Sequence, residues 1–181
     1  YGLVAEAVAQ GVTVTAIPGP SAVLMALSIS GLPTDRFTFE GFLPRKPGER
    51  RSTLRALAAE SRTMVFFESP ARLASSLADM GAAFGADRRI AVCRELTKFY
   101  EEVRRGTSAE LVEWATAGVK GEIVVVVEGA PHREASAEDA LAQVQSLVAS
   151  GVRLKEACAE VAAATGLSSR DLYQAALAAR S

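Results

Sequence analysis

Apolar and polar positions change along the chain in a way that predicts strands and helices in turn. Residues 123–127, IVVVV, contain no polar side chain, and residues 63–67, TMVFF, form a second continuous apolar run. A strand that is apolar on both faces belongs in the middle of a sheet covered on two sides. Shorter strands are predicted at 12–17, 37–43 and 89–93. Strands that alternate with helices at this spacing indicate an α/β layer architecture.

The helices are predicted from apolar runs bounded by capping residues, prolines and glycines. Thr107 and Glu110 have the spacing of a capping box, and Ser69 precedes Pro70 as an N-cap and first-turn pair. A loop with two prolines and one glycine is predicted at 44–51. The predicted helices are 3–10, 20–30, 52–60, 70–83, one that begins at Thr107, 136–150, 154–165 and 168–179.

The last two helices are joined by a turn that contains Gly166. Such a pair is typical of a helix-turn-helix and equally of an ordinary packed pair. Only Lys155 and Arg170 lie near the helix starts, so packing is the favoured interpretation. The chain divides into the three predicted parts 1–32, 33–131 and 132–181.

Composition narrows the classes of function. The 181 residues are 49% hydrophobic and 23% charged, with a net charge of -1, so a nucleic-acid contact would have to be local. Cys93 and Cys158 do not form a disulfide framework and fit a reducing cytoplasm. His132 is the single histidine, and without a Cys/His cluster no metal site is expected. No apolar run reaches the length that spans a membrane.

The stretch 12–22, VTVTAIPGPSA, is predicted as a strand, a tight turn at Pro18-Gly19-Pro20 and the start of a helix. Pro20 suits the first helical position. The free N–H groups of Ser21 and Ala22 could then receive the polar part of a ligand. A plain connection between strand and helix is the alternative.

In open α/β sheets, ligands bind beyond the carboxyl ends of the strands. Besides 18–22, polar residues gather at three such ends, where the alternative is a solvated loop. They are Glu68 after the second apolar strand, Arg94, Glu95 and Lys98 after 89–93, and Lys120, Gly121, Glu122, Glu128 and Gly129 around 123–127.

Four cations lie in the loop that contains the two prolines. They are Arg45, Lys46, Arg50 and Arg51. Each phosphate that a cation neutralises adds salt-dependent affinity, so a loop of this kind could bind an RNA backbone. A solubilising loop is the alternative.

Five motifs occur in a distinctive order: AIPGPSA, SGLPTDRFTFEGFLPRK, FFESPARL, RELTKFYEEVRRG and KGEIVVVVEG. Together they strongly resemble the ribosomal RNA small subunit methyltransferase I family, within the tetrapyrrole methylase-like (class III) S-adenosylmethionine methyltransferases. The resemblance is strong over about residues 1–130 and weaker over the helical tail. The FEGFLPRK and RELTK segments are specific to this family within the superfamily.

The resemblance implies a two-lobed α/β protein that binds S-adenosylmethionine between its lobes. It implies methyl transfer to the ribose 2′-hydroxyl of a cytidine in 16S rRNA, a homodimer and a cytoplasmic location. The chain begins at Tyr1 within a βα pattern. We therefore expect the end of the N-terminal lobe, the complete C-terminal lobe and a helical tail. Such a C-terminal fragment should bind S-adenosylmethionine weakly or not at all.

The resemblance also implies roles for individual residues. Catalysis has only weak candidates, chosen by location: Glu95, Lys98 and Glu101. Cofactor contacts are implied for Pro18, Gly19, Pro20, Ser21, Ala22, Phe67, Glu68, Cys93, Arg94, Gly121 and Glu122. RNA contacts are implied for Arg45, Lys46, Arg50 and Arg51.

Two other functions stay open from the sequence. One is a methyltransferase of the same superfamily that acts on a tetrapyrrole or corrinoid precursor. The other is a non-enzymatic nucleic-acid-binding fragment that works through residues 154–180, which the small number of cations in the tail disfavours.

Overall fold

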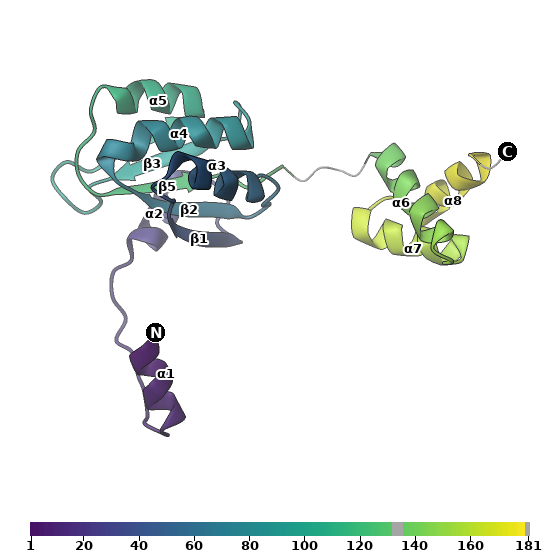
Figure 1. Ribbon diagram of the computed structural model, residues 1–181, viewed down its shortest axis with the longest axis horizontal. Helices are drawn as coiled ribbons and strands as arrows, with labels where there is room; N and C mark the ends of the chain where they lie inside the picture. Colours follow the sequence, from purple (N-terminus) through teal and green to yellow (C-terminus); the bar gives the residue numbers. More distant parts are fainter. Residues whose placement is uncertain (132–135, 180–181) are drawn as a thin grey trace. The chain divides into compact units, whose positions relative to one another are not determined.

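The computed structural model describes residues 1–131 and 136–179, so His132 lies outside the described residues. The chain forms two compact units, Tyr1–Gly129 and Ala130–Ser181, each with its own core (Figure 1). None of the described helices is long and apolar enough to cross a membrane.

Within the described residues, the first unit contains one five-stranded sheet in the order β1-β2-β5-β3-β4. The strands are β1 (Phe37–Phe42), β2 (Thr63–Glu68), β3 (Ile90–Arg94), β4 (Glu102–Gly106) and β5 (Ile123–Val127). Only β1 and β2 pair in parallel, and the other three pairs are antiparallel. The carboxyl ends of β1, β2 and β3 therefore lie beside the amino ends of β4 and β5, at one end of all five strands. We call this end of the sheet the site edge.

Helices cover both faces of the sheet (Figure 1). They are α2 (Ala22–Ser30), α3 (Pro47–Ala56), α4 (Pro70–Phe84) and α5 (Ser108–Thr116). Helix α1 (Gly2–Ala9) has no buried residue. The larger core lies between the sheet and α3, α4 and α5, and includes Leu54, Leu73 and Leu111. The smaller core lies under α2, where Ala26 and Leu27 pack on alternate residues of the strands. All five residues of β5 are buried, as the apolar run predicts.

A cation fixes α2 on its face of the sheet. Arg105, on β4, donates from Nε to the carbonyl of Ser30 at 2.8 Å and from a second nitrogen to the carbonyl of Ile29. These carbonyls lie in the last turn of α2, where helices leave acceptors unpaired and favour positive charge. The chain then turns at Gly31, whose φ is +76°. The start of α2 is thereby held near the site edge.

One predicted strand and two predicted helix starts are wrong. No strand forms at 12–17, because a strand exists through its hydrogen-bonded neighbour and no described segment pairs with these exposed residues. The next helix starts at Ala22, capped by the hydroxyl of Ser21, so Pro20 precedes the helix. Helix α3 begins at Pro47, inside the predicted loop, because proline is well suited to a first helical turn.

The second unit consists of α6 (Ala137–Ala149), α7 (Leu154–Thr165) and α8 (Ser169–Ala178), in agreement with the predicted helices. Small and branched side chains fill its core: Ala140, Val144, Ala157, Cys158, Val161, Leu172 and Ala176. Gly166 ends α7 in the left-handed conformation, with φ +74°, and lets α8 start three residues later.

Candidate functional site

A pocket of about 340 Å³ opens at the site edge. It is lined by the start of α2, the ends of β1 and β2, and the start of β5: Ala22, Phe42, Phe67, Glu68, Glu122, Ile123 and Val124. The structure thus brings together Ala22, Phe67, Glu68 and Glu122, which the sequence places in different motifs. The antiparallel direction of β5 is what admits Glu122, since it puts the beginning of that strand beside the end of β2.

The floor of the pocket is one row of side chains across the sheet. Phe42 is paired with Phe67, Phe67 with Val124, and Val124 with Cys93. Residues in one row share a face of the sheet, here the face under α2. The rings of Phe42 and Phe67 are 5.6 Å apart between centroids, and Phe39 meets Phe67 edge-on at 4.9 Å. The floor is apolar and aromatic.

Cys93 continues this row toward β4 and is fully buried. Burial raises the pKa of its thiol to about 11, because the low-dielectric surroundings disfavour the thiolate. The side chain is therefore not a nucleophile at neutral pH. Any contact of this residue with a ligand would be made by its backbone, as the sequence-based expectation has it.

Glu68 is buried in the next row, and its carboxylate holds the start of α4. It accepts from the backbone N–H of Ser69 and from the hydroxyl of Ser76, each at 2.7 Å. The guanidinium of Arg72 lies 2.5 Å from it. A carboxylate occupied in this way anchors a helix terminus, so its side chain is not free to bind a ligand.

Glu95 ties the loop after β3 to the start of β5. Its Oε1 accepts from the backbone N–H of Glu122 at 2.9 Å and from Lys98 Nζ at 3.0 Å. Lys98 Nζ also lies 3.1 Å from a carboxylate oxygen of Glu122. The Glu122 amide and the Lys98 ammonium hold the pKa of Glu95 below its ordinary value. The two carboxylates raise the pKa of Lys98.

These bonds bear on the three candidate catalytic residues. Glu95 is stabilised as the carboxylate and Lys98 as the ammonium, so each is a poor proton acceptor. Glu101 accepts from the backbone N–H of Thr97 at 2.6 Å and closes the same loop. The geometry brings the three together and gives each a role in holding the loop.

The other residues that were expected to contact the cofactor differ in how far they are buried. Pro18, Gly19 and Pro20 are exposed and outside regular structure, whereas Ser21 is half-buried at the start of α2. Arg94 donates to Glu102 at 2.6 Å across the β3–β4 pair. Gly121 lies directly before Glu122, and its φ is +99°. Glu128 and Gly129 follow the carboxyl end of β5 at the opposite edge, so the expectation that they share the site is wrong.

The four expected RNA-binding cations do not form one exposed group. Arg45 is exposed, and Lys46 is exposed beside Glu49, with 3.1 Å between the charged atoms. Arg50 is 5% exposed and donates to Asp79 on α4 at 2.6 Å, so its side chain joins two helices. Arg51 is exposed at 4.0 Å from Asp79. The expectation that Arg50 faces RNA does not fit its burial, which follows from α3 beginning at Pro47.

Three pocket residues were absent from the sequence-based set: Phe42, Ile123 and Val124. Phe42 could have been found, because it ends a strand that carries three exposed phenylalanines. Ile123 and Val124 required the direction of β5, which the apolar run itself does not contain. Among the described residues, no group of three or more His, Cys, Asp or Glu side chains could hold a metal ion.

Comparison with known proteins places a chain with this sheet and this pocket in a class of methylases. The chain belongs to the family of Tetrapyrrole (Corrin/Porphyrin) Methylases, whose sequence profile matches residues 1–112. A second profile, the RsmI C-terminal HTH domain, matches residues 134–180. The sequence pattern favoured an ordinary packed pair for the last two helices. This match instead supports the helix-turn-helix alternative.

Individual curated relatives indicate a narrower family than the sequence profile does. The chain is 56% identical over 182 aligned residues to "Ribosomal RNA small subunit methyltransferase I" of Mycobacterium tuberculosis (strain CDC 1551 / Oshkosh), which covers 99% of the chain and 63% of that protein. The protein of the same name from Pseudomonas aeruginosa is 44% identical, with 98% and 64% covered. The predicted resemblance is confirmed. The chain spans just under two-thirds of the length of these relatives.

Solved structures agree on the fold. A cobalt precorrin-4 methyltransferase, CbiF, matches with a TM-score of 0.51 at 18% identity, over 70% of this chain and 56% of its own. The methyltransferase CobJ matches with a TM-score of 0.52 at 22% identity, over 71% and 56%. The predicted tetrapyrrole methylase-like α/β fold is confirmed.

Proposed function

We propose that the protein is an S-adenosylmethionine-dependent methyltransferase that modifies the ribose 2′-hydroxyl of a cytidine in 16S rRNA. The observation that carries this proposal is the 56% identity to a ribosomal RNA small subunit methyltransferase I over 99% of the chain. Because the chain spans 63% of that relative, the proposal concerns the whole protein. A homodimer and a cytoplasmic location are part of it, and the two free cysteines are compatible with that location.

The pocket at the site edge fits part of S-adenosylmethionine. Its volume lies near the lower end of the range of ligand pockets, about 300–1,000 Å³. Phe42 and Phe67 offer ring faces and edges suited to an adenine. The exposed carboxylate of Glu122 also lines the pocket, and one of its oxygens is paired with Lys98. When bound, the cofactor supplies a methyl group on a positively charged sulfur.

The residues of this chain act mainly by positioning. Glu95 and Lys98 fix the turn before β5, and Glu68 fixes the start of α4, so both sides of the pocket are held by charged hydrogen bonds. Holding two reactants in line can lower a barrier by about 7–11 kcal/mol. Glu95 is not tuned as a base, because the Glu122 amide and Lys98 lower its pKa.

The second candidate is a methyltransferase that acts on a tetrapyrrole or corrinoid precursor. The description of the matched family favours it. The structural likeness to CbiF, at 18% identity, concerns the fold alone. The match of residues 134–180 to the RsmI C-terminal HTH domain supports the ribosomal substrate instead.

The test uses the protein made from the complete gene, incubated with S-adenosylmethionine and small ribosomal subunits from a strain that lacks the gene. Mass spectrometry of the 16S rRNA should show a new 2′-O-methylcytidine. A parallel reaction offers a porphyrinogen in place of the subunits. Unmodified rRNA together with a methylated porphyrinogen would replace the first proposal by the second.

A further inference from the structure

A second hollow, of about 360 Å³, lies on the surface of the helical unit. It is lined by the start of α7 and the first two turns of α8: Lys155, Ser169, Arg170, Tyr173 and Gln174. Among the described residues, neither Lys155 nor Arg170 forms an ion pair or a side-chain hydrogen bond. By contrast, Arg50, Arg94 and Lys98 in the first unit are all paired with carboxylates.

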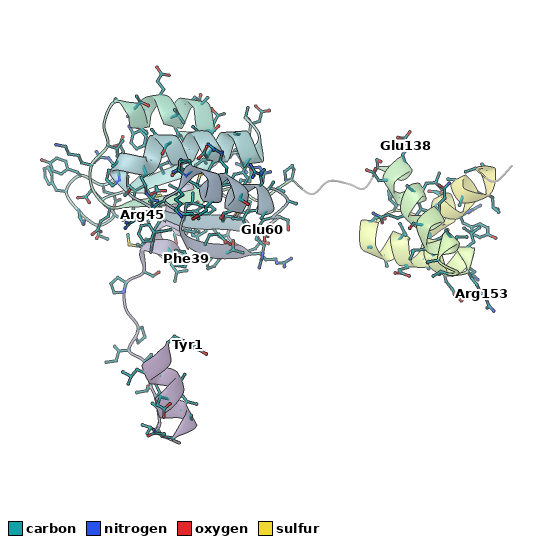
Figure 2. The ribbon with its side chains drawn as sticks, viewed as in Figure 1. Tyr1, Phe39, Arg45, Glu60, Glu138 and Arg153 are labelled. Carbon is teal, nitrogen blue, oxygen red and sulfur yellow. The ribbon has the colours of Figure 1, made fainter. Side chains whose placement is uncertain are left out.

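The rest of this unit is acidic. Its described residues include Glu138, Asp139, Glu156, Glu160 and Asp171. Arg153, two residues before Lys155, lies on the opposite side of the three helices from Glu138 (Figure 2). Glu156 and Asp171 follow the two cations directly in sequence, but adjacent helix positions do not face each other, and neither residue lines the hollow. The charged side chains that line the hollow are therefore the cations Lys155 and Arg170.

An aromatic ring lines the hollow together with the two cations. Tyr173 is 39% exposed and lines the same hollow, next to the amide of Gln174 and the hydroxyl of Ser169. Cations that track a phosphate backbone, beside an aromatic ring on which a base stacks, form the usual combination for binding single-stranded nucleic acid. The turn at Gly166 joins α7 to α8, and residues of both helices line the hollow.

We propose that this α7–α8 surface binds single-stranded RNA, with Lys155 and Arg170 on phosphates and Tyr173 stacked on a base. The identity of the RNA as ribosomal rests on the proposed function. Single-stranded RNA is favoured over duplex DNA because two or three cations on an acidic unit supply little of the phosphate neutralisation that a duplex binder needs.

The experiment measures binding of the 181-residue chain to a fluorescein-labelled single-stranded RNA of mixed sequence, about 12 nucleotides long. The double variant Lys155→Ala/Arg170→Ala should weaken binding at least about fivefold and make the log–log salt slope shallower by about 1.4. Tyr173→Ala should weaken binding at least about fivefold, whereas Tyr173→Phe should retain it.

A matched control separates the surface from net charge. Gln143→Glu/Gln145→Glu changes the charge by the same amount on exposed positions of α6, outside the hollow. It should change affinity by less than about twofold. Equal weakening by this control, unchanged binding in the Lys155/Arg170 variant, or tighter binding to a DNA duplex of the same length would overturn the proposal.

This outcome is independent of methyl transfer. Binding of a mixed-sequence RNA needs neither the cofactor nor the ribosomal target, so loss of the RNA surface would leave the proposed reaction standing. Conversely, an unmodified 16S rRNA in the reaction described above, with intact RNA binding here, would reject the proposed function and retain the surface.

Discussion

The side chain of Glu95 occupies the space that a Cβ atom on Gly121 would need. A Cβ built there would lie 2.4 Å from Glu95 Cγ and 2.5 Å from its Cδ and Oε1. Gly121 also has a φ of +99°, which side chains rarely adopt. Glycine therefore lets the loop after β3 approach the turn before β5 closely enough for Glu95 to reach the Glu122 amide.

Substitution of Gly121 by alanine should destabilise the protein by about 1–3 kcal/mol, the sum of backbone strain and a displaced carboxylate. Urea unfolding, followed by circular dichroism, measures the change. The double variant Glu95→Ala/Gly121→Ala should lose less stability than the two single variants added together. The reason is that Glu95→Ala removes the atoms that the new methyl group at position 121 meets.

Gly118→Ala is the matched control for this prediction. Gly118 has nearly the same φ, +97°, but nothing lies within 4 Å of its Cβ position. Gly118→Ala should therefore lower the free energy of unfolding only through backbone strain, by about 1 kcal/mol. Equal losses at the two positions would show that the approach of Glu95 contributes nothing.

The lowered pKa of Glu95 gives a dependence on acid. A group whose pKa is lower in the folded state stabilises the fold above its ordinary pKa, and this stability is lost as the pH falls through the folded value. Carboxyl carbon chemical shifts should show Glu95 titrating below the ordinary value of about 4.3. In Lys98→Met the midpoint should rise but stay lowered, because the Glu122 amide remains. A midpoint at the ordinary value in the parent protein would contradict the geometry.

The ion pair between Arg50 and Asp79 joins α3 to α4, with side chains 6% and 15% exposed. Arg50→Ala leaves the carboxylate buried without its close partner and should cost about 3 kcal/mol. Arg51→Ala is the control, because that side chain is 53% exposed and 4.0 Å from Asp79. Arg51→Ala should lower the free energy of unfolding by less than about 0.5 kcal/mol. Denaturant midpoints compare the two, and similar losses would refute the structural role of Arg50.

Local features of the structure could be predicted from the sequence. Thr107 and Glu110 form the predicted capping box, with the carboxylate accepting from the Thr107 amide at 2.8 Å, because both partners lie within one helical turn. The burial of β5 follows from its own five residues. The buried residues of the second unit likewise follow from the spacing of apolar residues along its three short helices.

Features that depend on distant partners could not be predicted. The apolar pattern of 123–127 is the same for either direction of the strand, so the placement of Glu122 at the pocket had to come from pairing with β2 and β3. The burial of Arg50 depends on Asp79, 29 residues further along the chain. The candidate site was therefore predicted as separate motifs, and the sheet decides which of them meet.

The aromatic floor of the pocket provides a direct test of the cofactor assignment. Phe67→Ala removes the ring that contacts both Phe39 and Phe42, and should weaken S-adenosylmethionine binding by the protein from the complete gene at least about fivefold. Phe37→Ala is the control, because Phe37 is an exposed ring at the beginning of β1 and does not line the pocket. Calorimetry measures both affinities. Since each variant deletes one phenylalanine ring from the sheet, equal affinities would place the adenine elsewhere, whereas a selective loss in Phe67→Ala would assign it to the row formed by Phe42, Phe67 and Val124.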